Sequence, residues 1–230
     1  MLLKKLREEV LEANLEIVRR GLVMYTFGNA SGCDRASGHV VIKPSGVPFE
    51  QLAPENMVVT TLDGAVVEGS LKPSSDLATH LELYRAFAGL GGVVHTHSTY
   101  ATAWAQAAKD IPCLGTTHAD YFHGPVPVTD PLDHEEISRD YELNVGKAIV
   151  RTFDGADPLA QPGILVRNHG PFVWGATPAQ AAMNAVLLEE IARIAAITIG
   201  LNPEASPMDR ELLNRHFYRK HGARATYGQG

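Results

Sequence analysis

The chain has 230 residues, of which 45% are hydrophobic and 20% charged, and its formal net charge at pH 7 is −6. This length suits one large domain. Because no linker, repeat or low-complexity tract interrupts the sequence, we expect a single domain over residues 1–230. The acidic balance argues against a nucleic-acid partner, and the lack of a long apolar run argues against a membrane helix.

The cysteines and the N-terminal segment favour a reducing compartment. Cys33 and Cys113 form no motif, and the first residues lead into a charged helical pattern without the apolar segment of a signal peptide. Two unpaired thiols without a secretion signal fit a cytoplasmic protein.

Hydrophobic periodicity predicts short strands interleaved with helices. In chain order, we expect a helix over 4–20, strands at 39–43, 57–61 and 65–68, a helix over 77–88, a strand at 91–95, a helix through 100–104, a helix over 137–153, a strand at 163–167, a long helix from Thr177 and a last helix near 208–219. The long helix begins with a capping box, Thr177 to Gln180, and its predicted apolar face is Met183, Val186, Leu187, Ile191 and Ile194. Because regular βαβ units are lacking, this order predicts a mixed or antiparallel sheet flanked by helices.

Three histidines stand at the ends of predicted strands. His95 and His97 follow the apolar run 91–94, and side chains at i and i+2 of a strand share one face. His169 follows a second apolar run, 163–166. Three neutral imidazoles leave an open coordination position, which is typical of catalytic zinc sites. The sequence therefore predicts a catalytic metal site at these histidines.

Nearby polar residues have two interpretations each. Asp76 is either a fourth ligand or base beside the metal, or the N-cap of the helix over 77–88. His80, one turn later, is interpreted as a packed core histidine or as a residue behind the ligands. His118 is a further candidate ligand whose spacing is uninformative.

Three segments offer donors for an anion. Lys43, Ser45 and Gly46 supply an ammonium, a hydroxyl and an open backbone, and residues 28–31 form a similar small loop. Ser74 and Ser75 precede a predicted helix, where free N–H groups favour an anion. Each segment alone also fits a turn or a cap. Together with a metal, they predict that a phosphate anchors a sugar whose carbonyl or hydroxyl the metal polarises.

The chain resembles the class II aldolase/adducin family along its whole length. The matching segments are LEANLEI, GNASGCDR, VVIKPSGV, EGSLKPSSDLATH, GGVVHTHSTYATAWAQ, GTTHADYF, NHGPFVWG, AVLLEEIA and HFYRKHGARATYGQ. The HTHS and KPSSD segments are shared with the aldolases of the family, whereas GTTHADYF and the KHGA…YGQ tail resemble its epimerase branch.

The resemblance implies a fold, an assembly and a cofactor. The implied fold is an α/β, three-layer αβα arrangement around a central, largely antiparallel mixed sheet, and the implied assembly is a homotetramer with active sites between subunits. One Zn²⁺ per subunit is implied, with Mn²⁺ or Co²⁺ as substitutes. The implied ligands are Asp76, His95, His97 and His169. The implied phosphate cradle is Gly28, Asn29, Lys43, Ser45, Gly46, Ser74 and Ser75.

The resemblance also implies the proton carriers. Asp120 and Tyr227 match the acid/base pair of the family, and Thr116 and His216 match positions that line the same pocket. Thr226 departs from the pattern, since an aromatic residue is expected beside the tyrosine. Without the resemblance, Asp120 is a loop aspartate and Tyr227 part of a chain end.

The implied substrate is a phosphorylated ketopentose. The implied reaction interconverts L-ribulose 5-phosphate and D-xylulose 5-phosphate by cleaving and re-forming the C3–C4 bond, because the hydrogen on C4 is not acidic. One alternative is an aldolase of the same family that acts on a ketose 1-phosphate and carries glutamate where Asp76 stands. A second alternative is a non-catalytic module like the adducin head domain, which could dispense with the metal ligands that are all present here.

Overall fold

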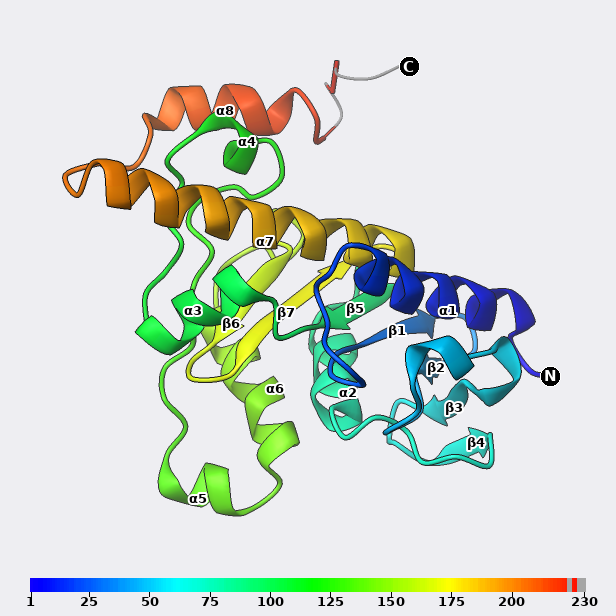
Figure 1. Cartoon of the computed structure of the whole chain (residues 1–230). Helices are drawn as coiled ribbons and strands as arrows, with labels where there is room; N and C mark the ends of the chain where they lie inside the picture. The colour runs from blue at the N-terminus through cyan, green and yellow to red at the C-terminus, as the bar shows by residue number, and fades with distance from the viewer. Residues whose placement is uncertain (223–224, 227–230) are drawn as a thin grey trace.

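Seven short strands form one sheet in the order β4-β3-β2-β1-β5-β7-β6 in the computed structural model, which describes residues 1–222 and 225–226 (Figure 1). The strands are β1 (Asn29–Asp34), β2 (His39–Ile42), β3 (Val58–Thr61), β4 (Val66–Glu68), β5 (Gly92–His95), β6 (Gly163–Val166) and β7 (Gly170–Gly175). Every pairing between these strands is antiparallel, and Val128 and Leu165 add an isolated parallel bridge.

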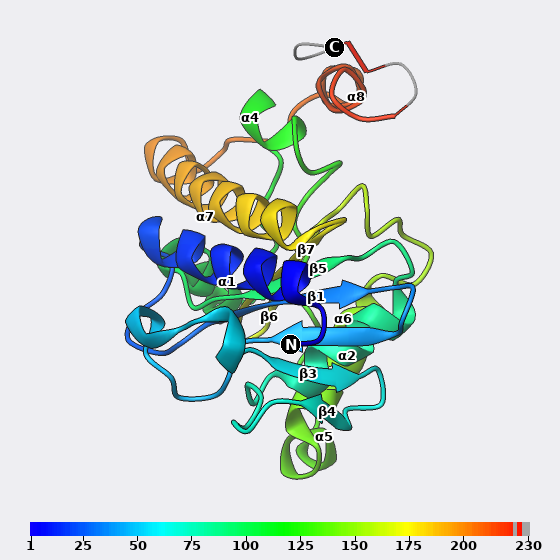
Figure 2. The same cartoon turned by 90° about the vertical axis from the view of Figure 1, so that its right-hand side faces the viewer.

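Helices cover both faces of the sheet. One layer holds α1 (Lys4–Arg19), α3 (Thr99–Ala107) and α7 (Pro178–Leu201), and the other holds α2 (Leu77–Ala86) and α6 (Tyr141–Thr152) (Figures 1 and 2). Val94 and Val173 join the core of the first layer, whereas Val93, Phe172 and Trp174 join that of the second. This alternation follows from the two-residue period of a strand, and it confirms the predicted three-layer αβα fold.

The remaining helices are short or peripheral. They are the 3₁₀ turns η1 (Phe49–Gln51) and η2 (Pro54–Asn56), and the α-helices α4 (Thr116–Ala119), α5 (His134–Ser138) and α8 (Arg210–Tyr218). Both views show α4 and α8 on the side of α7 that faces away from the sheet (Figures 1 and 2). Within the described ranges, no helix combines the length and apolarity needed to cross a membrane.

The predicted helix over 137–153 is wrong as one element. It divides into α5 and α6, because Arg139 is extended and Asp140 adopts a left-handed conformation with φ 49°. Aspartate tolerates this conformation better than most residues. Asp133 caps α5 by accepting a hydrogen bond from the backbone N–H of Glu136 at 2.8 Å. Residues 139 and 140 therefore separate the two helices, and α6 begins at Tyr141.

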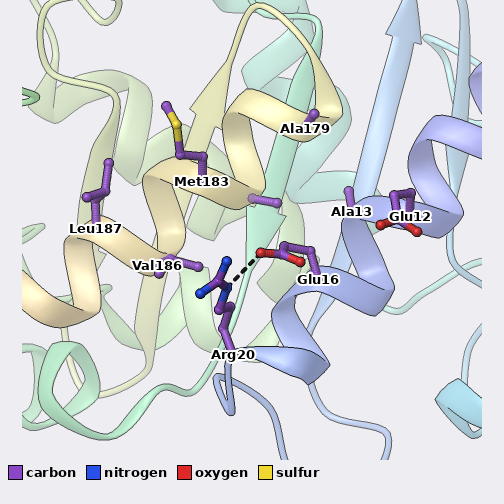
Figure 3. Close-up of a pocket in the computed structure, with 9 residues that line it drawn as sticks. Glu12, Ala13, Glu16, Arg20, Ala179, Met183, Val186 and Leu187 are labelled. Carbon is purple, nitrogen blue, oxygen red and sulfur yellow. Dashed lines mark hydrogen bonds and ion pairs between the residues drawn. The ribbon is translucent and has the colours of Figure 1, made fainter.

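The predicted apolar face of α7 is correct only in part: Ile191 is buried, and Val186 and Leu187 pack partly buried against the same core, but Met183 and Ile194 are exposed. The side chains that pack on the sheet are mostly small: Ala181, Ala182, Ala185, Leu188, Ile191, Ala192 and Ala195. Met183 and Ile194 are 44% and 40% exposed, and Met183, Val186 and Leu187 line a groove between α1 and α7 (Figure 3). Alanine predominates on the buried face of α7, which allows the helix to approach the strands closely, and Leu188 and Ile191 are its large buried residues.

The capping box at the start of α7 forms only in part. Thr177 Oγ1 accepts a hydrogen bond from the backbone N–H of Gln180 at 3.1 Å, as predicted. The side chain of Gln180, however, accepts from the N–H of Ala176 and not from that of Thr177. Thr177 is still the N-cap of α7 as predicted, and only the hydrogen bond of the Gln180 side chain reaches one residue further back than in a capping box.

Gly92 is predicted to be required where β5 meets α7. A Cβ atom there would lie 2.5 Å from the carbonyl oxygen of Thr177 and 2.6 Å from Cα of Pro178, and backbone atoms cannot move aside. Gly92→Ala should therefore lower the free energy of unfolding in urea by about 1–3 kcal/mol. Gly200→Ala is the control, since nothing lies within 4 Å of its Cβ and alanine favours a helix. An unchanged urea midpoint for Gly92→Ala would contradict this packing.

Candidate metal and phosphate site

The three predicted histidines meet at one edge of the sheet. His95 is the last residue of β5, His97 follows two residues later, and His169 lies in the turn between β6 and β7. One ring nitrogen from each falls within 4.8 Å of the other two. The antiparallel pairing of β5 with β7 produces this meeting, because it sets His95 opposite Phe172, three residues after His169.

The turn that carries His169 is held close to β5 by its backbone. Asn168 adopts a left-handed conformation with φ 61°, and the N–H of His169 donates to the carbonyl of Val166 at 3.0 Å. A Cβ at Gly170 would lie 2.7 Å from the carbonyl oxygen of Thr96. Glycine at this position therefore allows the turn to approach the segment that carries the other two histidines.

The electrostatics of the triad fit a divalent cation. Nδ1 of His95 donates to the carbonyl of Pro171 at 2.9 Å, so its Nε2 carries a lone pair, and this atom lies 3.0 Å from Nε2 of His97. Burial lowers the pKa of His95 to about 3, and the partly desolvated site also lowers the pKa of His97 and of His169. All three imidazoles are thus neutral at pH 7, which is the form that binds metal.

Asp76 lies beside the triad without belonging to it. It occupies the N-cap position of α2, but its side chain makes no capping hydrogen bond, so the N-cap interpretation is wrong for the side chain. Its Oδ2 instead accepts from the side-chain amide of Asn29 at 2.6 Å. Burial alone would raise the pKa of Asp76, but nearby histidines and this hydrogen bond lower it. Its role as a fourth ligand stays a prediction.

A cavity of about 360 Å³ opens next to the triad, and all seven residues of the predicted phosphate cradle line it. They are Gly28, Asn29, Lys43, Ser45, Gly46, Ser74 and Ser75. Two of the loops are joined by backbone hydrogen bonds, from Ser45 N–H to the carbonyl of Lys72 and from Ser74 N–H to that of Lys43. The structure therefore places the predicted cradle and the predicted metal ligands around one cavity.

In the described residues, Lys43 lacks a carboxylate partner and the side-chain oxygen of Asn29 lacks a donor. Lys43 is only 2% exposed; its ammonium lies 3.3 Å from the carbonyl of Pro44 and 4.8 Å from the ring centroid of Phe49. No carboxylate in the described part of the chain pairs with it. Asn29 donates to Ser74 and Asp76, and its own buried Oδ1 stays without a partner. A buried unpaired cation is costly, so the cavity suits an anion.

The other histidines stand apart from the triad. His80 is fully buried and its Nδ1 lies 2.7 Å from the hydroxyl of Ser31, which confirms the interpretation as a packed core residue. His118 directs its Nε2 to the carbonyl of Gly124 at 2.8 Å and does not join the metal cluster. The expectation that His118 could be a ligand is therefore wrong within this chain.

Asp120, Thr116 and His216 form a second group, away from the cavity. Asp120 accepts hydrogen bonds from His216 Nδ1 at 3.0 Å and from both nitrogens of the Arg219 fork, and the ammonium of Lys220 lies 3.4 Å away. Thr116 starts α4, whose packing on α8 brings these residues together. None of them lines the cavity. Tyr227 lies outside the described residues.

Sequence reasoning missed two aromatic residues at the triad. The ring of Phe27 stacks on His97 with centroids 6.1 Å apart, and the hydroxyl of Tyr141 lies 3.3 Å from Nδ1 of His169. Phe27 directly precedes the predicted anion loop, a position that could have drawn attention to it. No sequence pattern marks Tyr141 as a site residue, because it lies inside the predicted helix over 137–153.

Comparison with known proteins identifies the family. Residues 8–196 match the model of the Class II Aldolase and Adducin N-terminal domain. The chain belongs to this family.

Individual proteins that resemble this chain are named as an epimerase and as aldolases. A protein of Salmonella paratyphi B named L-ribulose-5-phosphate 4-epimerase UlaF is 55% identical over 227 residues, which are 99% of this chain and 100% of that protein. A solved L-fuculose 1-phosphate aldolase superposes with a TM-score of 0.79 at 24% identity, covering 94% of this chain and 95% of that one. The L-fuculose-1-phosphate aldolase of Thermus thermophilus has a TM-score of 0.67 at 26% identity, covering 86% and 97%.

Phosphate binding by metal-free protein is predicted to weaken at alkaline pH. Burial lowers the pKa of Lys43 from the usual value of about 10.4. The ammonium, and with it the attraction for phosphate, is present below this lowered pKa and is lost as the pH rises through it. Calorimetry with inorganic phosphate between about pH 7.5 and 10 should show the loss. Lys43→Arg keeps its charge over this range and should show a flat profile, whereas a flat wild-type profile would contradict the assignment.

Proposed function

We propose that this protein is a metal-dependent L-ribulose-5-phosphate 4-epimerase that interconverts L-ribulose 5-phosphate and D-xylulose 5-phosphate. The observation that carries the proposal is that three neutral imidazoles and a buried lysine without a carboxylate partner line the same cavity. The 55% identity to a protein named for this activity, over nearly the whole chain, supports it.

The chemistry requires a carbon–carbon bond to break. The hydrogen on C4 is not α to the carbonyl, so no base can remove it directly. Loss of the proton from the C4 hydroxyl instead turns C4 into an aldehyde, and the electron pair of the C3–C4 bond passes to the three-carbon fragment. Rotation of the aldehyde and re-addition to its opposite face restore the bond with C4 inverted. The enzyme must therefore stabilise negative charge and retain both fragments.

The residues of the cavity divide these tasks. His95, His97 and His169 would hold a divalent cation, with Asp76 alongside, and we propose Zn²⁺ with Mn²⁺ or Co²⁺ as substitutes. The bound cation would supply Lewis-acid stabilisation to the negative charge that develops on the sugar oxygens. Lys43 and the serine loops would hold the phosphate, so that the two-carbon fragment rotates without leaving.

Asp120 and Tyr227 are the proposed proton carriers, supplied by a neighbouring subunit of a homotetramer. Burial alone would raise the pKa of Asp120, but hydrogen bonds from Arg219 and His216 lower it, so the carboxylate is ionised and able to accept a proton. An apolar loop beside the cavity supports a covering subunit, since Tyr25 is 91% exposed and Phe27 56% exposed.

The aldolase alternative is not favoured. The aldolases of the family are expected to use a glutamate for proton transfer where Asp76 stands. Here the shorter carboxylate accepts a 2.6 Å hydrogen bond from Asn29, which suits a residue that orients or ligates and does not shuttle protons.

His97→Asn is predicted to lower metal content and turnover together, because an amide is a poor replacement for an imidazole ligand. Metal bound after dialysis and D-xylulose 5-phosphate formed from L-ribulose 5-phosphate are measured on the same sample. His134→Asn, an exposed residue of α5, is the control and should change neither. Full turnover of His97→Asn without bound metal would refute the metal proposal.

Tyr227→Phe is predicted to retain metal and stability but to lose epimerisation, because only the phenolic proton is removed. Mixing its subunits with His97→Asn subunits should restore part of the activity, since some sites would then combine an intact triad with an intact Tyr227. Normal turnover of Tyr227→Phe alone would exclude this residue as a proton carrier, and an inactive mixture would argue against sites shared between subunits.

A further inference from the structure

Tyr141 contacts the metal triad from outside the cavity lining. Its hydroxyl lies 3.3 Å from Nδ1 of His169, and its ring is stacked on that imidazole with centroids 6.2 Å apart and planes 23° from parallel. A ring nitrogen of a metal-binding histidine commonly needs such a partner, which fixes the tautomer and the orientation of the ring.

The three imidazoles differ in the groups that contact their rings and fix their orientation. His95 is fixed by the backbone carbonyl of Pro171 and by stacking on Phe172 at 4.1 Å between centroids. His97 packs against Phe27. For His169, the side-chain hydroxyl of Tyr141 faces Nδ1. A substitution that removes only this hydroxyl can therefore test how His169 is oriented.

Tyr141 lies where α6 packs closely on α2. Tyr141 is the first residue of α6, and the neighbouring carbonyl of Glu142 accepts a hydrogen bond from Thr79 of α2. A Cβ at Gly146 would lie 2.7 Å from Cβ of Glu82, so α6 and α2 are in close contact. The same helix α2 begins just after Asp76. Packing of the two helices thus sets the tyrosine relative to the site.

We propose that Tyr141 is a positioning residue for the metal site: its hydroxyl oxygen accepts the Nδ1–H of His169 and leaves the other ring nitrogen free as the ligand atom. The inference rests on the proposed function, because it requires that the triad holds a metal. A ring without this partner can rotate or adopt the other tautomer, and either change removes a ligand atom from the cluster.

The test is the zinc affinity of Tyr141→Phe, which keeps the stacked ring and removes only the hydroxyl. Zinc dissociation constants are measured by competition with a chromogenic chelator, at a temperature where both metal-free proteins are folded. Loss of such a partner costs about 10- to 100-fold in metal affinity, and this increase in the dissociation constant is expected. The unfolding midpoint of the metal-free protein should change little, because His169 is only partly buried and water can replace the lost hydroxyl.

Tyr218→Phe is the matched control, since Tyr218 is 54% exposed and lies on α8; its zinc affinity should equal that of the wild type. A zinc affinity of Tyr141→Phe within twofold of the wild type would overturn the role of Tyr141. Failure of the wild-type protein itself to bind zinc would instead overturn the metal-site proposal, so the two failures are distinguishable.

Discussion

The site depends on the antiparallel pairing of β5 with both of its neighbours. This pairing sets Asn29, His95 and Phe172 in one row across three strands, and side chains in such a row share one face. Phe172 then stacks on His95, while Asn29 contacts Asp76 at the start of α2. A shift of one residue in either pairing would turn His95 to the opposite face, so the register of the central strands controls the chemistry.

The same cavity is lined by groups that favour a cation and by a group that favours an anion. The triad offers lone pairs without positive charge, since burial keeps its imidazoles neutral, whereas Lys43 offers a positive charge without a protein anion. One end therefore suits a cation and the other an anion. A sugar phosphate satisfies both, because its phosphate pairs with the lysine and its oxygens approach the metal.

The sequence predicted most of what depends on local pattern. The spacing of His95 and His97 and the donor-rich loops pointed to residues that line one cavity, and most predicted helices and strands are present. Strand β1 was missed because its residues, Asn29–Asp34, are small and give little strand signal. Strand β7 was missed because Pro171 and the glycines at its two ends interrupt a short run that otherwise favours a strand. The close contacts of these strands require such small residues, as at Gly170, which lies against Thr96. The contact of Tyr141 with His169 joins residues far apart in the chain and had no local pattern. Asp120 does not line the cavity of its own chain, so its proposed role follows from the resemblance to the family and not from a local pattern.

The most direct test of this account is an assay of metal-loaded protein with L-ribulose 5-phosphate that follows D-xylulose 5-phosphate and free glycolaldehyde phosphate together, with and without a chelator. The account predicts chelator-sensitive formation of D-xylulose 5-phosphate with little free aldehyde, because the phosphate site retains the fragment while it rotates. Release of glycolaldehyde phosphate without the epimer would contradict it and place the protein among the aldolases of the family.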